Sequence, residues 1–264
     1  MKKIFLFAAA VVAALTVNAA DKSWNFTTLF PDAESIAAVQ FTIGDGQTPN
    51  ALVDGELYVY GNGKDKAWAM DPLQSAKYFV DFLTQEESIP QETSEGINYK
   101  QTRLKSGGAG SVAEGKIKGA IAFCVAGNST VTVAAVSSSG SAVRKLQLLD
   151  ANGTEVGYAL FDGNVGKLDG NKKIKDDPFV FNYVGGATTL YLVSAMQVTD
   201  AATDGYTAGG INFYKVAATN VAPWAPQGIN HVNASAKTVK RVVDGQVVIE
   251  RDGRMFNLLG AEVK

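Results

Sequence analysis

The sequence predicts an all-β protein, because its hydrophobic pattern alternates and turn signals recur at short intervals. Between residues 21 and 217, apolar and polar side chains alternate with a period of two, the period of a half-buried strand. The chain has 27 glycines against 7 prolines, and 46% of its 264 residues are hydrophobic, so turns and a sizeable core are both available. Short strands separated by turn signals every ~8–12 residues are typical of a sandwich or a barrel.

The expected strands of this central region are bounded by turn signals at Gly127-Asn128, Ala151-Asn152-Gly153 and Gly185-Gly186. Helical signal is weak by comparison. Ser75–Thr84 alone has the length of a helix, and its aromatic residues fit a strand equally well, so we expect one or two short helical turns at most. The stretches 32–53 and 81–102 show no clear period. The acidic run formed by Gln85–Glu87 and Gln91-Glu92 is expected to be a solvated loop. The strands expected from the pattern are Gly119–Val125, Thr130–Val136, Lys145–Asp150, Glu155–Leu160, Pro178–Tyr183, Thr188–Val193 and Gly209–Val216.

Residues 1–20 have the pattern of a signal peptide. Lys2 and Lys3 precede the apolar stretch Ile4–Val17, and small residues lead up to Asp21, which predicts cleavage after Ala19 or Ala20. The apolar stretch is shorter than the about 20 residues that a membrane-spanning helix needs. We therefore expect a secreted, cell-surface or periplasmic protein without a transmembrane anchor.

The C-terminal end has the composition of a small separate unit. We expect the sandwich domain to cover residues 21–217 and a linker rich in proline and asparagine to cover 218–238. Beyond the linker, Asp-Gly turns at 244–245 and 252–253 separate short alternating segments, which predicts a β-hairpin or meander over 239–264. Its strands are expected at Val239–Val243, Gln246–Arg251 and Arg254–Leu259.

Composition excludes several classes of function. The formal net charge of −2 argues against a nucleic-acid partner. One cysteine and one histidine rule out a disulfide framework and a Cys/His zinc site, and Cys124 is expected to be a buried strand residue. Because no carboxylate pair with glycosidase spacing stands out, we expect no catalysis, although a lyase or hydrolase that uses Tyr and Arg stays as a lesser alternative.

Calcium is the one cofactor for which the sequence offers ligands. Oxygen-bearing side chains crowd the segments Asp162–Asn164, Asp169–Asn171 and Asp176-Asp177, and hard cations prefer such groups. Four lysines at 167, 172, 173 and 175 lie among these carboxylates and disfavour a cation. A charged, solvated loop is therefore the favoured interpretation, and we expect no other cofactor.

Several motifs follow one another in a recognisable order. They are Trp24-Asn25-Phe26, Thr102–Gly110, Gly119–Val125, Gly127–Val133, Ser137–Ser141, Arg144–Leu146, Tyr183, Gly185-Gly186, Thr188–Leu192 and Gly210–Val216. In this order they resemble the β-sandwich modules appended to secreted pectate lyases and related polysaccharide-utilisation proteins of Bacteroidetes. The tail from Gly228 to Lys264 is similar to the short C-terminal segment of many exported Bacteroidetes proteins. Such modules usually accompany a catalytic β-helix, for which this chain has no room, so the resemblance implies a stand-alone module with a jelly-roll-type sandwich and a carbohydrate-binding role.

The candidate binding residues are aromatic rings that could stack on sugars and basic residues that could pair with a uronate carboxylate. Tyr58 and Tyr206 also lie beside polar segments, but alternating aromatic residues equally suit the core, and basic residues equally suit ion pairs on the sheet surface. We expect non-catalytic binding of extracellular polysaccharide, with pectin-like polymers in first place. The alternative is a structural or adhesive surface protein that binds other proteins. The residues selected for ligand binding are Arg103, Lys105, Arg144, Trp68, Tyr60 and Tyr99.

Overall fold

The computed structural model divides the chain into two compact units, residues 1–226 and 227–264, each of which is described by itself. The structure describes residues 19–39, 48–61, 68–75, 79–80, 82–113, 116–161, 174–175, 178–196, 205–224, 239–243, 246–251, 254–256 and 262–263.

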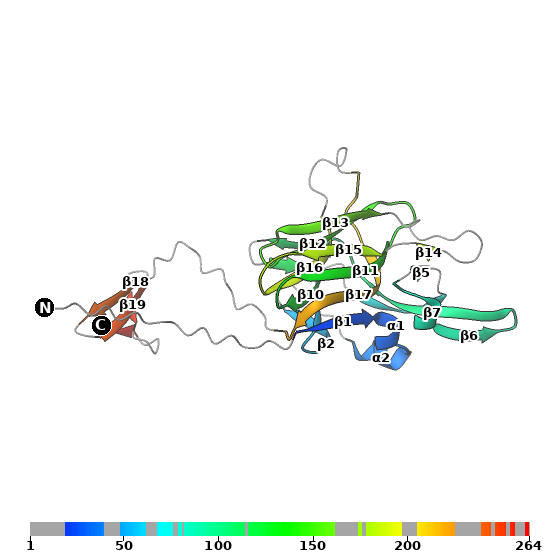
Figure 1. Ribbon diagram of the computed structural model, residues 1–264, viewed down its shortest axis with the longest axis horizontal. Coiled ribbons are helices and arrows are strands. Elements are labelled where there is room, and N and C mark those ends of the chain that lie inside the picture. The colour runs from blue at the N-terminus through cyan, green and yellow to red at the C-terminus, as the bar shows by residue number, and fades with distance from the viewer. Residues whose placement is uncertain are drawn as a thin grey trace. The chain divides into compact units, whose positions relative to one another are not determined.

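The larger unit is built from two antiparallel sheets (Figure 1). The first sheet has the strand order β13-β12-β16-β10-β3-β2 and the second has the order β15-β11-β17, with β1 and β7 along the other side of β17. The strands of the first sheet are β2 (Pro49–Val53), β3 (Leu57–Tyr60), β10 (Ala120–Val125), β12 (Arg144–Leu149), β13 (Glu155–Phe161) and β16 (Thr188–Ser194). Those of the second are β1 (Ala20–Asn25), β7 (Gly96–Lys105), β11 (Ser129–Ser137), β15 (Phe179–Tyr183) and β17 (Ile211–Ala222).

The order in which the chain visits the two sheets is that of a jelly roll. It crosses from β10 to β11, returns for the hairpin β12–β13, crosses again to β15, returns to β16 and ends the circuit in β17. The sheets join at one corner, where Cys124 and Val125 of β10 pair with the end of β17. The predicted all-β jelly-roll sandwich is therefore confirmed, and the expected central strands match β10, β11, β12, β13, β15, β16 and β17.

The hydrophobic core lies between the two sheets and follows the predicted alternation. On β12, Leu146 and Leu148 are fully buried, whereas Lys145 and Gln147, which alternate with them, are only partly buried. The largest core side chains include Phe123 of the first sheet and Phe213 of the second, both 0% exposed. Because one face of each strand is apolar, burying these faces against each other is the main stabilising contribution to the fold.

Outside the core, one hairpin covers part of the outer face of the first sheet. Its strands are β8 (Ser111–Ala113) and β9 (Lys116–Lys118). Val112 and Ile117 of this hairpin pack against a second apolar cluster on that outer face, which contains Tyr60, Leu149 and Tyr191. Outward-facing residues of the first sheet are thus buried in a layer of their own.

The remaining elements lie beside β7. They are β4 (Ala69–Ser75) and β6 (Ile89–Thr93), which pair with β7, and β5 (Phe79–Val80), which pairs in parallel with β14 (Ile174–Lys175). The hairpin of β6 and β7 extends beyond the sandwich (Figure 1). Short helical segments in the described chain are α1 (Phe26–Leu29), α2 (Ala33–Ala38) and the 3₁₀ turn η1 (Gln85–Glu87).

The expectation of one or two short helical turns is confirmed by α1 and α2. Asn25 and Asp32 cap them, because their side-chain oxygens accept hydrogen bonds from backbone N–H groups at the helix starts. One expectation for this region was wrong. The acidic run is not a solvated loop, since Glu87 forms an ion pair with Lys215, a residue that is only 9% exposed.

The smaller unit is a sheet of antiparallel strands in the order β18-β19-β20-β21. Its bounds are β18 (Val239–Val243), β19 (Gln246–Arg251), β20 (Arg254–Phe256) and β21 (Glu262–Val263). The first two match the expected strands, β20 covers the first part of the expected Arg254–Leu259, and β21 was not expected. The expected end of the sandwich at residue 217 was too early, because β17 continues to Ala222 and pairs there with β10. Among the described residues, no helix has the length and hydrophobicity to cross a membrane.

Candidate functional site

The structure buries two of the three aromatic residues selected for ligand binding, Trp68 and Tyr60. Trp68 is 3% exposed, its indole Nε1 donates a hydrogen bond to the Tyr60 carbonyl oxygen at 3.0 Å, and its ring stacks on Phe213 in the core. Tyr60 points to the outer face but is only 6% exposed and meets Tyr191 edge to face. Neither ring offers a free face to a sugar, which corrects their assignment as stacking platforms. Tyr206 is also buried, whereas Tyr99 on β7 is half-buried.

The basic candidates do not converge on one site either. Arg103 of β7 lies opposite Asp71 of β4, and its Nε donates to the carboxylate at 2.7 Å. Burial opposes the charge of Arg103, but interactions with Tyr214 and Asp71 outweigh it and raise the pKa of the guanidinium. Lys105 is exposed at the end of the same strand, on the same face as Arg103.

Arg144 belongs to the other sheet and has a structural environment. Its Nη1 donates to the Thr207 carbonyl oxygen at 2.9 Å and to the Thr207 hydroxyl, and its guanidinium lies flat against Gly209. Desolvation lowers the pKa of Arg144, which is 9% exposed. The side chain therefore fixes the segment before β17 to the start of β12.

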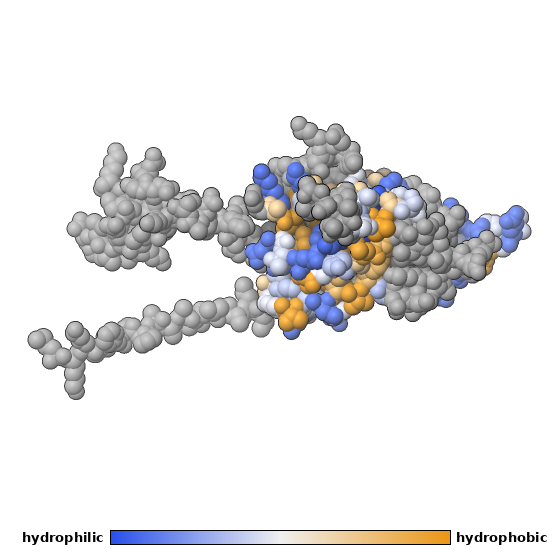
Figure 2. All heavy atoms as spheres, turned by 90° about the horizontal axis from the view of Figure 1, so that it is seen from above, coloured by the Kyte–Doolittle hydropathy of each residue, from blue (hydrophilic) through white to orange (hydrophobic). Residues whose placement is uncertain are grey.

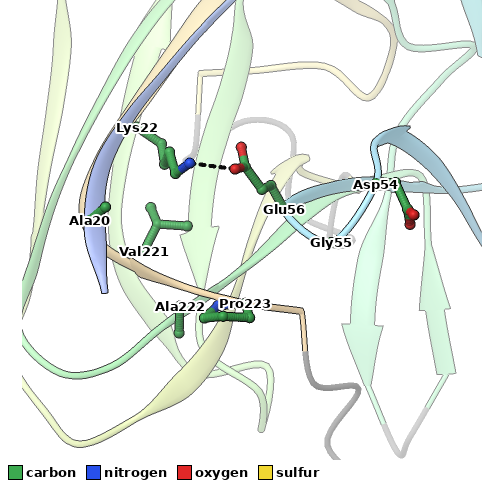
Figure 3. A pocket seen from close by; sticks show the side chains of 8 residues that line it. All are labelled: Ala20, Lys22, Asp54, Gly55, Glu56, Val221, Ala222 and Pro223. Atoms are coloured by element: carbon green, nitrogen blue, oxygen red, sulfur yellow. Dashed lines mark hydrogen bonds and ion pairs between the residues drawn. The ribbon is translucent and has the colours of Figure 1, made fainter. Parts of the chain in front are cut away.

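A pocket of about 360 Å³ opens at another place, where three segments distant in sequence meet (Figure 3). The start of β1 provides Ala20 and Lys22, the turn between β2 and β3 provides residues 54–56, and the end of β17 provides residues 221–223. The turn closes with a hydrogen bond from the Glu56 amide to the Val53 carbonyl oxygen, and Gly55 adopts a φ of +74° that favours glycine. The fold positions the pocket because β1 and β17 are paired neighbours.

The polar side chains of the pocket are charged, and an ion pair and hydrogen bonds fix their orientation. Lys22 and Glu56 point toward each other and form an ion pair (Figure 3), and the Trp24 indole donates to the other Glu56 oxygen at 3.2 Å. Partial burial favours the neutral acid, but the hydrogen bonds from Lys22 and Trp24 outweigh it and lower the pKa of Glu56. The Asp54 carboxylate is directed away from Glu56 and accepts a hydrogen bond from the Tyr58 hydroxyl at 3.1 Å.

Two aromatic rings stand beside this pocket. Tyr58 and Trp224 stack with 4.2 Å between ring centroids and 28° between ring planes, and both keep part of their surface exposed. The Trp224 amide donates to the Gly55 carbonyl oxygen at 2.7 Å, which ties the chain after β17 to the β2–β3 turn. Tyr58 was considered from the sequence but not selected as a binding residue, and Trp224 was not considered because it lies in the expected linker. The sequence signal for Trp224 was a tryptophan between Pro223 and Pro226.

This arrangement can hold a ligand by ring contact and hydrogen bonds, but it lacks an acid–base couple. A general acid needs a raised pKa to be protonated near neutral pH, whereas the pKa of Glu56 is lowered. The described residues include no group of three or more His, Cys, Asp or Glu side chains that could hold a metal ion. The carboxylates considered for calcium, Asp162, Asp169, Asp176 and Asp177, lie outside the described residues.

A second surface carries an exposed ring on the outer face of β12 and β13. Tyr158 is 55% exposed, and the Lys145 ammonium lies 4.3 Å from its ring centroid and 2.9 Å from Glu155. Leu160, 46% exposed, lies on the same face and extends this surface, and Met196, just after β16, is 54% exposed. Figure 2 shows apolar residues reaching the described surface of the sandwich between polar ones. The surface is a patch rather than a pocket.

No protein-family model and no curated protein matches the chain.

Proposed function

We propose that the protein is a secreted, non-catalytic carbohydrate-binding protein and that it holds extracellular polysaccharide at the pocket beside Tyr58 and Trp224. The observation that carries the proposal is the juxtaposition of a partly exposed aromatic pair with a pocket lined by Lys22, Asp54 and Glu56. Sugars present C–H faces that pack on aromatic rings and hydroxyl groups that bond to charged side chains. The volume of about 360 Å³ lies at the lower end of the range for small-molecule sites, which suits one or two sugar units of a longer chain.

Two further points support binding over catalysis. Glu56 is ionised and already bonded to Lys22 and Trp24, so it is poorly suited to donate a proton to a glycosidic oxygen. The order of sequence motifs, with its resemblance to modules of secreted Bacteroidetes pectate lyases, points to the same role in polysaccharide utilisation. Export by the N-terminal signal would place the protein where such polymers occur.

The proposal is tested by affinity gel electrophoresis of the exported protein against a panel of plant and host polysaccharides. We expect at least one polymer to retard the wild-type protein and Trp224→Ala to weaken binding about tenfold, the effect of losing roughly 1.4 kcal/mol of ring contact. Tyr158→Ala is the matched control, because it removes an exposed ring outside the pocket. Thermal melting of both variants checks that the fold is intact. The absence of retardation on every polymer would overturn the proposal.

A structural or adhesive role is the second candidate, favoured by the exposed side chains of Tyr158, Leu160 and Met196. Adjacent exposed apolar residues on a sheet face are typical of surfaces that bind proteins. If this surface drives assembly, sedimentation should show self-association that rises with concentration and is lost in Leu160→Ser. Self-association together with the absence of any glycan binding would make this the better assignment.

A further inference from the structure

The charge of the pocket restricts the class of glycan that it can take. Its described lining contains one basic side chain, Lys22, against two carboxylates, Asp54 and Glu56. The Lys22 ammonium is already neutralised, because it is ion-paired with Glu56. An α-amino group at Ala20, which the predicted cleavage after Ala19 would create, would bring the local charge only to zero. The pocket therefore offers no net positive charge to an acidic ligand.

The residues that could pair with a uronate carboxylate are engaged elsewhere. Arg103 is bonded to Asp71 across β4 and β7, and Arg144 is bonded to Thr207 before β17. A carboxylate is recognised best by a guanidinium that presents two parallel donors to it, and neither arginine lines the pocket. Lys105 lies on β7 and does not line the pocket either.

From these observations we propose that the pocket selects a neutral polysaccharide and rejects polyuronates. This inference rests on the proposed function and specifies its ligand class. The carboxylate oxygens of Asp54 and Glu56 are acceptors for the hydroxyl groups of a neutral sugar. Tyr58 and Trp224, which stack beside the pocket without lining it, supply the apolar contact to the neighbouring part of the chain. The same carboxylates repel a polymer that carries a negative charge on each sugar, so they serve both attraction and rejection. Among pectin-like polymers, the neutral galactan and arabinan chains fit this pocket, and polygalacturonate does not.

The decisive variant is Glu56→Gln, which keeps the shape of the side chain but removes its charge and releases Lys22 from its ion pair. We expect the wild-type protein to be retarded by a neutral polymer, with galactan, arabinan and xyloglucan as probes, and not by polygalacturonate. Glu56→Gln should gain about fivefold in affinity for polygalacturonate, the effect of about 1 kcal/mol for unit charges near 4 Å in water. That gain should disappear at high salt.

The matched control is Glu155→Gln, which changes the net charge equally and releases Lys145 at the patch on β12 and β13. If both variants gain affinity for polygalacturonate, the effect comes from net charge and the assignment to the pocket fails. Salt-sensitive retardation of the wild-type protein by polygalacturonate, with none by neutral polymers, would overturn the inference and leave the proposed function standing. Absence of retardation on both kinds of polymer would overturn the proposed function itself.

Discussion

Replacing Gly153 by alanine should destabilise the sandwich by separating the β8–β9 hairpin from the turn between β12 and β13. Gly153 has a φ of +79°, and a Cβ atom there would overlap the Val112 carbonyl group, 3.1 Å from its carbon. The left-handed backbone costs an alanine about 1–2 kcal/mol. To relieve the overlap, the hairpin must also shift, and Val112 then loses part of its packing against the cluster around Leu149, which is worth about 1–2 kcal/mol for a half-buried valine. The expected loss in the free energy of unfolding is about 3 kcal/mol.

Gly205→Ala isolates the packing contribution. Gly205 has a similar φ of +66°, but a Cβ atom there would meet nothing within 4 Å, so this variant carries only the backbone cost. Denaturant unfolding followed by tryptophan fluorescence should show Gly153→Ala losing about 1–2 kcal/mol more than Gly205→Ala, the packing contribution alone. In thermal melts that difference corresponds to roughly 2–8 °C in Tm for a domain of this size. Equal losses in the two variants would mean that the hairpin is not held against this turn, and the covering of Tyr60 and Tyr191 would lose its explanation.

Further predictions concern pH and reactivity. Because the pKa of Glu56 is lowered in the folded protein, its ionised form stabilises the fold at pH values above the ordinary pKa of 4.5. This contribution disappears as the pH falls through the folded pKa. The Tm advantage of the wild-type protein over Glu56→Gln should therefore be constant from pH 7 to pH 5 and should shrink below pH 5. Burial, with a smaller effect of Cys124, raises the pKa of Tyr60 from 10.0 to about 12. The free energy of unfolding should therefore fall as pH rises from 10 to 12, and it should fall less in Tyr60→Phe. An unchanged dependence of the free energy of unfolding on alkaline pH in that variant would contradict the burial of the hydroxyl. The Cys124 thiol, 5% exposed, should react with a thiol reagent only after denaturation, and rapid labelling of the native protein would be the contrary result.

The strands could be predicted because their signal is local. Along β12 the apolar residues Leu146 and Leu148 alternate with polar ones, and Gly153 marks the following turn, so a short window of sequence contains the whole pattern. The Asp-Gly turns predicted the strands of the small C-terminal unit for the same reason. The helices at 26–38 were missed because each is short and is fixed by one cap, Asn25 or Asp32, rather than by a periodic apolar stripe.

Burial of the aromatic candidates depends on contacts that alternation does not encode. Tyr60 lies in the apolar cluster on the outer face of its sheet. Val112 and Ile117 of the hairpin at 111–118, more than fifty residues further along the chain, pack on this cluster together with Trp224, and no local pattern predicts where these segments pack. Trp68 lies beside a polar stretch in the sequence but enters the core because β4 pairs with β7 next to Phe213.

The pocket, too, depends on contacts between distant segments that local sequence patterns do not predict. Its lining comes from Ala20, Lys22 and the segments 54–56 and 221–223. They are brought together by the pairing of β1 with β17 and by the hydrogen bond from the Trp224 amide to the Gly55 carbonyl oxygen. The proline- and asparagine-rich composition predicted that Trp224 belongs to a linker. A large apolar ring is not stabilised in a solvated linker, whereas in this structure the Trp224 ring stacks on Tyr58. A tryptophan within an otherwise polar, proline-bounded segment thus indicates that this part of the segment packs against the preceding domain. The linker is then expected to begin after the tryptophan.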